Sequence, residues 1–123
     1  MDQERRERIA VVGVSDDPVK YGHRIFRDML NAGYQVEAVN PKGGSVLGRR
    51  RYRNLGEITP RPDMVIAVVP PEATKKVLEE CRCLGIGELW LQPGAGSPEV
   101  LEKAERYGIR TVSACFMARK GIW

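Results

Sequence analysis

The fold is decided by the sequence IAVVGVS at residues 9–15. Residues 9–12 are apolar without interruption, and Gly13 follows them directly. Such a run is typical of a strand that is buried on both faces of a parallel sheet. A glycine directly after the strand allows a tight exit and a close approach of other backbone. The segment therefore predicts a buried parallel strand, and the rest of the chain shows what surrounds it.

Four further segments are predicted to be strands, at residues 35–39, 64–69, 88–92 and 110–114. Apolar residues at helical spacing lie between most of them and precede glycines that would end the helices. Residues 42–62 are rich in Gly, Arg and Pro, and we expect a loop there with room for a short strand or helical turn. The alternation predicts one Rossmann-like α/β domain over residues 1–123. Its sheet is expected to be five-stranded and mainly parallel, in the order 3-2-1-4-5, with helices on both faces.

The last of the predicted helices has a clear start. Ser97 is suited to the N-cap position, and Pro98 and Glu99 suit the first helical turn. We expect Val100, Leu101, Ala104 and Tyr107 to face the core, and Gly108 to end the helix.

The composition excludes several classes of protein. Of the 123 residues, 42% are hydrophobic and 29% are charged, which excludes a disordered tail, a collagen-like repeat and a disulfide scaffold. No stretch approaches the roughly 18 apolar residues of a membrane span, and the charged N-terminus does not resemble a signal peptide. Three cysteines suit reduced thiols, while a single histidine and no CxxC pair argue against a metal site. We therefore expect a cytoplasmic protein without membrane attachment.

The net charge of +4 fits an anionic partner but is mild. Arginines interleaved with an aromatic residue at positions 49–53 suggest a nucleic-acid surface. Such arginines are more often solvated or ion-paired, and no RNA-binding motif accompanies them. Nucleic acid is therefore not the favoured partner, and the oligomeric state stays open, including a homo-oligomer.

Ligands of open parallel sheets bind at the carboxyl ends of the strands, so the residues after each strand are the candidates. After the first strand, Gly13 permits close backbone approach and Ser15 can bond a phosphate oxygen. The dinucleotide fingerprint GxGxxG is absent. The helix that begins near Gly22 is still an anion site, which Lys20 and Arg24 flank.

The second predicted strand ends in Asn40-Pro41-Lys42, which is the most discriminating stretch of the chain. Proteins that bind NAD place Asp or Glu here to hold the ribose hydroxyls. A cation instead suits a phosphorylated ribose, as in NADP or the 3′-phosphate of coenzyme A. An ordinary Asn-Pro turn is the alternative interpretation.

The remaining strand ends are less specific. Pro70 and Pro71 form a rigid apolar shelf on which an adenine ring can pack, or they only start a helix. A polar amide and a sharp turn follow the fourth strand at residues 92–94, and Cys115 follows the fifth. This thiol is either a small core residue or lies near the reactive end of a ligand. No catalytic constellation is present, so we expect a binding protein rather than an enzyme.

Taken together, the segments resemble a known family. IAVVGVSDDPVKYGHRIFRDMLNAGYQVEAVNPKGGSVLGRRRYRNL, DMVIAVVPPEAT, ELWLQPGA and CFM, between residues 9 and 117, resemble the small single-domain CoA-binding proteins. These are similar to the N-terminal CoA-binding domain of the succinyl-CoA synthetase alpha subunit. The glycine-rich TGxxG pattern of the synthetase is missing here. Its domain with the phosphorylated histidine is also missing, so ligase activity of this chain alone is not expected.

The resemblance implies a coenzyme A site at the carboxyl edge of the sheet. Residues 13–15 with Lys20 and Tyr21 would approach the phosphates, and residues 40–42 would surround the adenosine and its 3′-phosphate. Residues 69–71 would form the adenine or pantetheine wall. Residues 92–94 would flank the pantetheine arm, with Cys115 near its end. The expected contacts are Gly13, Val14, Ser15, Lys20, Tyr21, Asn40, Pro41, Lys42, Val69, Pro70, Pro71, Gln92, Pro93, Gly94 and Cys115.

The function expected from the sequence is binding of coenzyme A or an acyl-CoA as a non-catalytic carrier, sensor or regulatory protein. Two alternatives belong to other classes. One is an NADP-binding oxidoreductase or a redox-sensing domain, and the other is an interaction module with a vestigial nucleotide pocket.

Overall fold

The stretch at residues 9–15 builds the centre of a seven-stranded sheet in the computed structural model, which describes residues 6–123. Strand β1 (Arg8–Val12) lies between β2 (Gln35–Val39) and β5 (Met64–Ala67), and both pairings are parallel. Residues 1–5, on which the expectation of no signal peptide partly depends, lie outside the described residues. The predicted buried strand is therefore the centre of the architecture.

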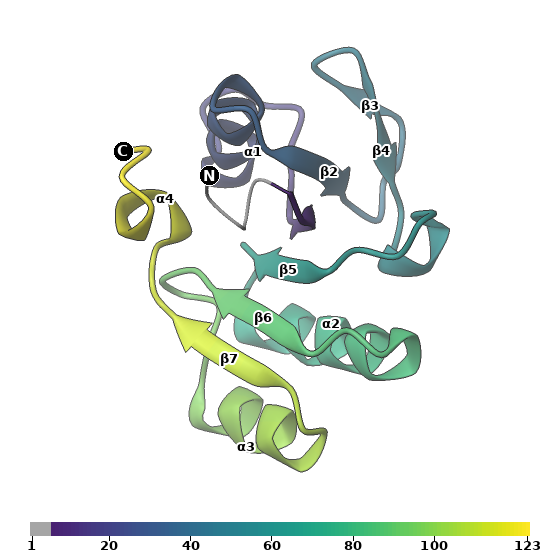
Figure 1. The fold of residues 1–123 in the computed structure, drawn as a ribbon, viewed down its shortest axis with the longest axis vertical. Helices are drawn as coiled ribbons and strands as arrows, with labels where there is room; N and C mark the ends of the chain where they lie inside the picture. Colours follow the sequence, from purple (N-terminus) through teal and green to yellow (C-terminus); the bar gives the residue numbers. More distant parts are fainter. Residues whose placement is uncertain (1–5) are drawn as a thin grey trace.

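The other strands extend the sheet on both sides. Beyond β5 lie β6 (Glu88–Leu91) and β7 (Arg110–Ser113), and beyond β2 lie β4 (Arg49–Tyr52) and the short β3 (Ser45–Val46). Within the described chain, each strand pairing is parallel except that of β3 with β4. The β3–β4 hairpin therefore forms one end of the sheet and β7 the other (Figure 1).

The predicted Rossmann-like α/β architecture is confirmed, but the predicted strand number and order are wrong. In the expected order 3-2-1-4-5, the strand at residues 64–69 lay at the edge, whereas β5 pairs with β1. The place beside β2 belongs to β4, inside the stretch 42–62 that was expected to be mainly loop. This stretch also holds the 3₁₀ helix η2 (Leu55–Glu57). The apolar pattern did not reveal β4 because its buried residue is Arg51, whose charge is satisfied by hydrogen bonds.

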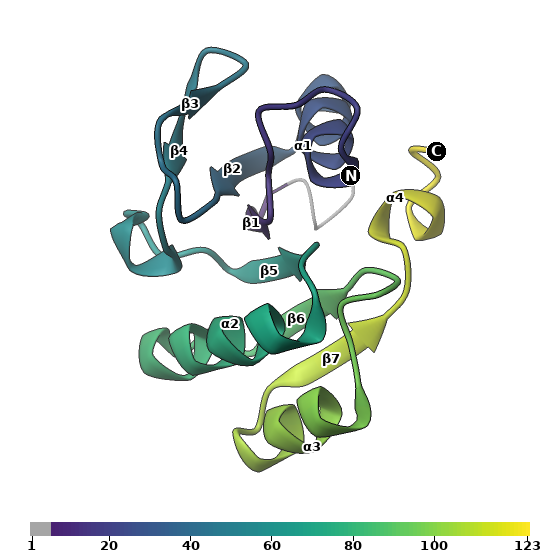
Figure 2. The same ribbon diagram turned by 180° about the vertical axis from the view of Figure 1, so that it is seen from behind.

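Helices cover both faces of the sheet. Helices α1 (Tyr21–Asn31) and α4 (Phe116–Arg119) lie on one face, and α2 (Pro71–Leu84) and α3 (Pro98–Arg106) on the other (Figure 1 and Figure 2). Alternate residues of β1 point to opposite faces, so Ile9 joins the core under α1 and Ala10 the core under α2. Within residues 6–123, no helix combines the length and apolar character needed to cross a membrane.

The predicted start of α3 is confirmed, but the prediction that Leu101 faces the core is wrong. The Ser97 hydroxyl caps the helix by accepting a hydrogen bond from the Val100 N–H at 3.1 Å. Val100 and Ala104 are buried as expected, but Leu101 is 44% exposed. Consecutive helical residues point about 100° apart. The turn that buries Val100 therefore directs Leu101 away from the core.

Two glycines fix the position of α1 against β1. Gly13 has a φ of 108°, and a Cβ atom at this position would collide with the carbonyl group of Val68. A Cβ atom on Gly22, in the first turn of α1, would collide with the carbonyl oxygen of Gly13. The helix therefore begins in direct backbone contact with the exit of the central strand.

The variant Gly22→Ala tests this contact. The added methyl group has to displace the Gly13 carbonyl, and we expect a loss of about 1–3 kcal/mol in the free energy of unfolding. Urea denaturation followed by circular dichroism measures the loss. The control is Gly87→Ala, because a Cβ atom there meets nothing within 4 Å and the change should stay within about 0.5 kcal/mol. Equal stability of the two variants would contradict the proposed contact.

Candidate functional site

The carboxyl edge of the sheet gathers the residues expected to form the site. Because β1, β2, β5, β6 and β7 are parallel, the segments that follow them meet at one edge. The expected residues differ in exposure. Lys20, Pro41, Lys42, Pro70, Pro93 and Gly94 are exposed; Gly13, Ser15, Tyr21, Asn40, Val69, Pro71 and Cys115 are half-buried; Val14 and Gln92 are buried.

The loop after β1 is held by hydrogen bonds at its backbone. The N–H groups of Gly13 and Val14 donate to the Val39 carbonyl at 2.9 and 3.2 Å. The Ser15 carbonyl lies 2.8 Å from Nδ1 of His23, which must donate because a carbonyl only accepts. His23 thus connects α1 to the loop after β1. The loop is therefore tied to β2 and to α1 through its backbone.

Arg51 is the residue of this edge that the sequence analysis missed. Its side chain is 6% exposed and donates to the Val14 carbonyl at 3.0 Å and to the Gly43 carbonyl at 2.6 Å. It also lies 3.8 Å from the carboxylate of Asp16. The Arg-rich run had suggested a surface for nucleic acid, but this arginine is an internal tie between two loops. A run of arginines in one sequence does not distinguish the two roles.

Asn40 connects the second strand end to the same loop. Its Nδ2 donates to the Val14 carbonyl at 3.1 Å, and its Oδ1 accepts from the Lys42 N–H at 2.9 Å. The Asn-Pro turn is therefore also hydrogen-bonded to the loop after β1. The Lys42 side chain stands exposed beside it.

A basic hollow lies next to this turn. It has a volume of about 200 Å³ and is lined by Gly43, Gly44, Arg50, Arg51, Arg53 and Glu57. Glu57 lies 3.7 Å from Arg50, so one of the three guanidinium groups has a carboxylate partner within the hollow. Because Asp16 also lies 3.8 Å from Arg51, three cations against two anions leave the hollow with a small excess of positive charge.

The shelf after β5 is present, and it also starts a helix. Pro71 occupies the first turn of α2, and the Pro70 carbonyl accepts hydrogen bonds from the backbone N–H and the hydroxyl of Thr74. Pro70 is exposed, and Val69 is half-buried. The interpretation of Pro71 as a helix start is confirmed, and packing of an adenine ring on the pair stays a prediction.

Gln92, Tyr21 and Cys115 form a connected group at the far end of the edge. Nε2 of Gln92 donates to the Tyr21 hydroxyl at 2.9 Å, and its Oε1 accepts from the Phe116 N–H at 2.7 Å. The Tyr21 hydroxyl lies 3.5 Å from Sγ of Cys115. Because Gln92 already donates to the Tyr21 oxygen, the tyrosine proton is free to point at the sulfur. Gln92 thus connects α1 to the start of α4 by two hydrogen bonds.

The two cysteines on the opposite faces of the sheet differ in acidity. Burial raises the pKa of the Cys115 thiol, but hydrogen bonds from Tyr21, Ala118, Gln92 and Met117 outweigh it and hold the pKa below that of an ordinary thiol. Burial and the contact with Cys115 raise the pKa of Tyr21, so its hydroxyl stays protonated. Burial raises the pKa of Cys81 to about 12. Cys81 is therefore an inert core thiol, and Cys115 is the more easily ionised of the pair.

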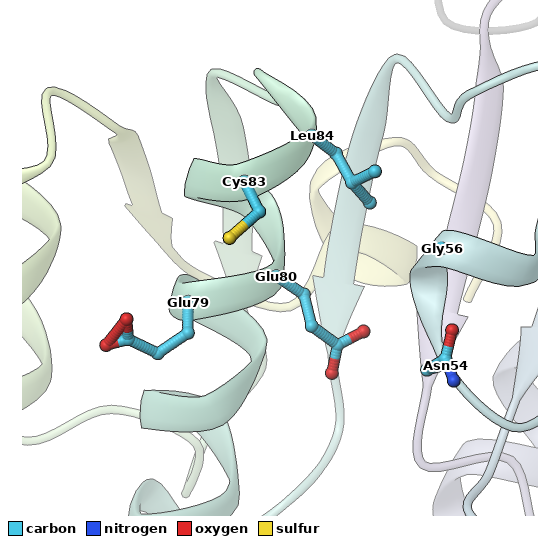
Figure 3. A pocket seen from close by; sticks show the side chains of 6 residues that line it. All are labelled: Asn54, Gly56, Glu79, Glu80, Cys83 and Leu84. Carbon is cyan, nitrogen blue, oxygen red and sulfur yellow. The ribbon is translucent and has the colours of Figure 1, made fainter.

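Another hollow lies away from this edge. It has a volume of about 420 Å³ between η2 and the second half of α2, where Figure 3 shows Glu80 and Leu84 on the side of Asn54 and Gly56. Its lining residues include two glutamates and no cation. An anionic ligand is therefore disfavoured there, and the carboxyl edge is the better candidate.

The family of the chain follows from comparison with known proteins. A model of the CoA-binding domain matches residues 7–120, which is nearly the whole chain. The chain therefore belongs to the family of CoA-binding domains, as its resemblance to the small CoA-binding proteins indicated.

Three relatives show how this domain occurs. The chain is 33% identical to the alpha subunit of an ADP-forming acetate–CoA ligase (II) of Pyrococcus furiosus, over 85% of this chain and 25% of that subunit. It is 34% identical to the uncharacterised protein YneT of Bacillus subtilis, over 89% of this chain and 80% of that protein. A solved structure of a conserved hypothetical protein from Pyrococcus furiosus superposes with a TM-score of 0.86 at 36% identity, over 92% and 98% of the two chains. The chain spans about a quarter of the ligase subunit and nearly all of the hypothetical protein.

Replacement of Arg51 tests its role as a tie. In Arg51→Met the carbonyls of Val14 and Gly43 lose a charged donor, so we expect unfolding to become easier by about 1.5–3 kcal/mol. Arg49→Met, at an exposed position of the same strand, should change stability by less than about 0.5 kcal/mol. Chemical denaturation of both variants measures the difference. If Arg51→Met left the free energy of unfolding unchanged, the role assigned to this residue would be contradicted.

Proposed function

We propose that the chain binds coenzyme A along the carboxyl edge of the sheet, as a non-catalytic carrier, sensor or regulatory protein. The observation that carries the proposal is the second strand end, where Lys42 and a basic hollow stand in place of an acidic ribose clamp. Membership of the CoA-binding family supports the same ligand. Each part of coenzyme A is assigned below to the segment whose chemistry suits it.

The diphosphate is assigned to the loop after β1 and the start of α1. Helix α1 begins at Tyr21 with no side-chain cap and no acidic residue in its first turn. Its first N–H groups therefore suit an anion, and Lys20 adds a positive charge at the same place. The carbonyls of Val14 and Ser15 are bonded to side chains of the protein. This leaves fewer lone pairs to repel a phosphate.

Two carboxylates on this loop would repel a phosphate and therefore limit where the diphosphate can lie. Asp16 and Asp17 are exposed on the same loop. Asp17 accepts from the Val19 N–H at 3.0 Å, and Asp16 lies near Arg51. The phosphates are therefore assigned to the Gly13 and Tyr21 side of the loop rather than to its outer tip.

The 3′-phosphate is assigned to Lys42 and the adjoining basic hollow. Arginine and lysine are the residues that bind phosphate groups most strongly. Arg53 lines this hollow and lies over Gly43, where even a Cβ atom would approach its guanidinium group to 3.0 Å. Arg50 lines the hollow as well, so the excess of positive charge faces the place where the phosphorylated ribose is expected.

The adenine and the pantetheine arm are assigned to the apolar part of the edge. Val69, Pro70 and Pro71 offer a surface with few donors, which suits an aromatic base or the pantetheine chain. The exposed turn of Pro93 and Gly94 would flank the arm. Its thiol end would then lie near Cys115.

The proposal assigns binding, and not ligation, to this chain. Acetate–CoA ligase activity belongs to proteins of which the chain spans only a part. The same edge would also suit NADP, because Lys42 fits a 2′-phosphate equally well. An interaction module without a ligand remains the third possibility. The three differ in which nucleotide stabilises the protein.

Thermal unfolding in the presence of nucleotides tests the proposal. Coenzyme A at a hundred times its dissociation constant adds about 2.7 kcal/mol of stability. For a chain of this length, this raises the melting temperature by about 10 °C. Dephospho-CoA at the same concentration should give a smaller shift, and NAD and NADP should give none. The proposal would be overturned if NADP alone raised the melting temperature. It would also be overturned if none of the four nucleotides raised it.

A matched pair of variants locates the 3′-phosphate. Lys42→Gln should reduce the shift with coenzyme A towards the shift with dephospho-CoA, while the shift with dephospho-CoA stays as it is. Lys76→Gln, at an exposed position on α2, removes the same charge elsewhere and should leave both shifts unchanged.

A further inference from the structure

We propose that the hollow beside the ends of β6 and β7 receives the apolar acyl group of an acyl-CoA. The proposal rests on the proposed coenzyme A site, which would bring the thioester to this end of the edge. It deepens that function, because it makes an acyl thioester the preferred ligand over free coenzyme A.

The hollow has the size and lining of a small-molecule site. Its volume is about 350 Å³, and Leu91, Pro98 and Leu101 supply apolar walls. Ligand pockets typically measure roughly 300–1,000 Å³ and are mainly apolar with a few polar groups. Gly94 and Gly96 contribute backbone only, so the space between the walls stays open.

The hollow continues the proposed path of the pantetheine arm. Gln92 and Gly94, which are expected to flank the arm, also line the hollow. Ser113 lines it too and lies two residues before Cys115, near which the thiol end is expected. The hollow lies on the α3 side of the sheet and Cys115 on the α1 side, so an acyl group on that thiol would enter the hollow across the turn at Gln92 and Gly94.

The polarity of the lining selects among acyl groups. None of the residues that line the hollow is charged. The Ser97 hydroxyl already caps α3 by accepting from Val100. A carboxylate at the end of a succinyl or malonyl group would therefore lack a cation, whereas a saturated acyl chain would contact leucine and proline.

Leu101 is an exposed apolar side chain that lines the hollow. It is 44% exposed on α3, while its neighbour Val100 is completely buried in the core. A leucine at the mouth of a hollow contributes binding energy when an apolar ligand covers it. The acyl chain gives this side chain a partner.

Calorimetric titration with a series of thioesters tests the proposal. Each buried methylene contributes up to about fourfold in affinity. We expect hexanoyl-CoA to bind at least about tenfold more tightly than acetyl-CoA, with butanoyl-CoA between them. Succinyl-CoA should bind no more tightly than acetyl-CoA. Affinity that does not depend on chain length would overturn the proposal.

Three variants assign the effect to the hollow. Leu101→Gln removes an apolar wall at an exposed position, and Gly96→Val fills the space beside Leu91, where a Cβ atom makes an ordinary 3.4 Å contact. Both variants should abolish most of the increase in affinity with acyl chain length and leave the affinity for free coenzyme A unchanged. Glu102→Gln, on the exposed next position of α3, should behave as the parent protein.

The outcomes separate the two proposals. If free coenzyme A binds and the chain-length gain survives in both Leu101→Gln and Gly96→Val, the acyl site is wrong and the coenzyme A site stands. If Leu101→Gln changes the oligomeric state of the protein, the hollow is a contact between copies of the chain and the acyl site is wrong. If no coenzyme A derivative binds, the proposed function itself fails.

Discussion

The carbonyl oxygen of Val14 accepts hydrogen bonds from both Asn40 and Arg51, and the carboxyl edge depends on this junction. It joins the exit of β1, the turn after β2 and the buried residue of β4. The close backbone contact between Gly13 and Gly22 then sets α1 onto the same exit. Three strands and one helix are thus fixed to one another within a few residues, at the edge where coenzyme A is proposed to bind.

The junction also shapes the electrostatics of the edge. A buried guanidinium group is costly unless its donors are used, and Arg51 uses its donors on two backbone carbonyls. The carbonyl dipoles of the loop are therefore turned towards the protein, while Lys20 and Lys42 remain exposed on either side. Asp16 and Asp17 act in the opposite direction at the tip of the loop. The exposed lysines therefore lie at the start of α1 and at the turn after β2, on either side of these carboxylates.

The apolar strands and the capped helix could be predicted from the sequence, and the hairpin could not. IAVVGVS and the run at residues 64–69 are continuous enough to identify buried strands. The order failed because β4 lacks this pattern: its inward residue is Arg51, which lies between the exposed Arg50 and the half-buried Tyr52. Leu101 was assigned to the core although it directly follows the buried Val100, and consecutive helical residues point about 100° apart. The hydrogen bonds of Gln92 join residues that are 24 and 71 positions away along the chain, which no local pattern contains.

The account's central claim is that coenzyme A lies along the carboxyl edge, and an NMR titration of the ¹⁵N-labelled protein tests it most directly. Coenzyme A should shift the amide signals of Gly13, Gly44 and Gly94, which follow strands at this edge or flank the basic hollow. Signals of Gly87 and Gly108, which precede β6 and β7 at the opposite edge, should stay in place. Shifts confined to the opposite edge or to the hollow around Gly56 and Cys83 would contradict the claim, as would a spectrum that coenzyme A leaves unchanged.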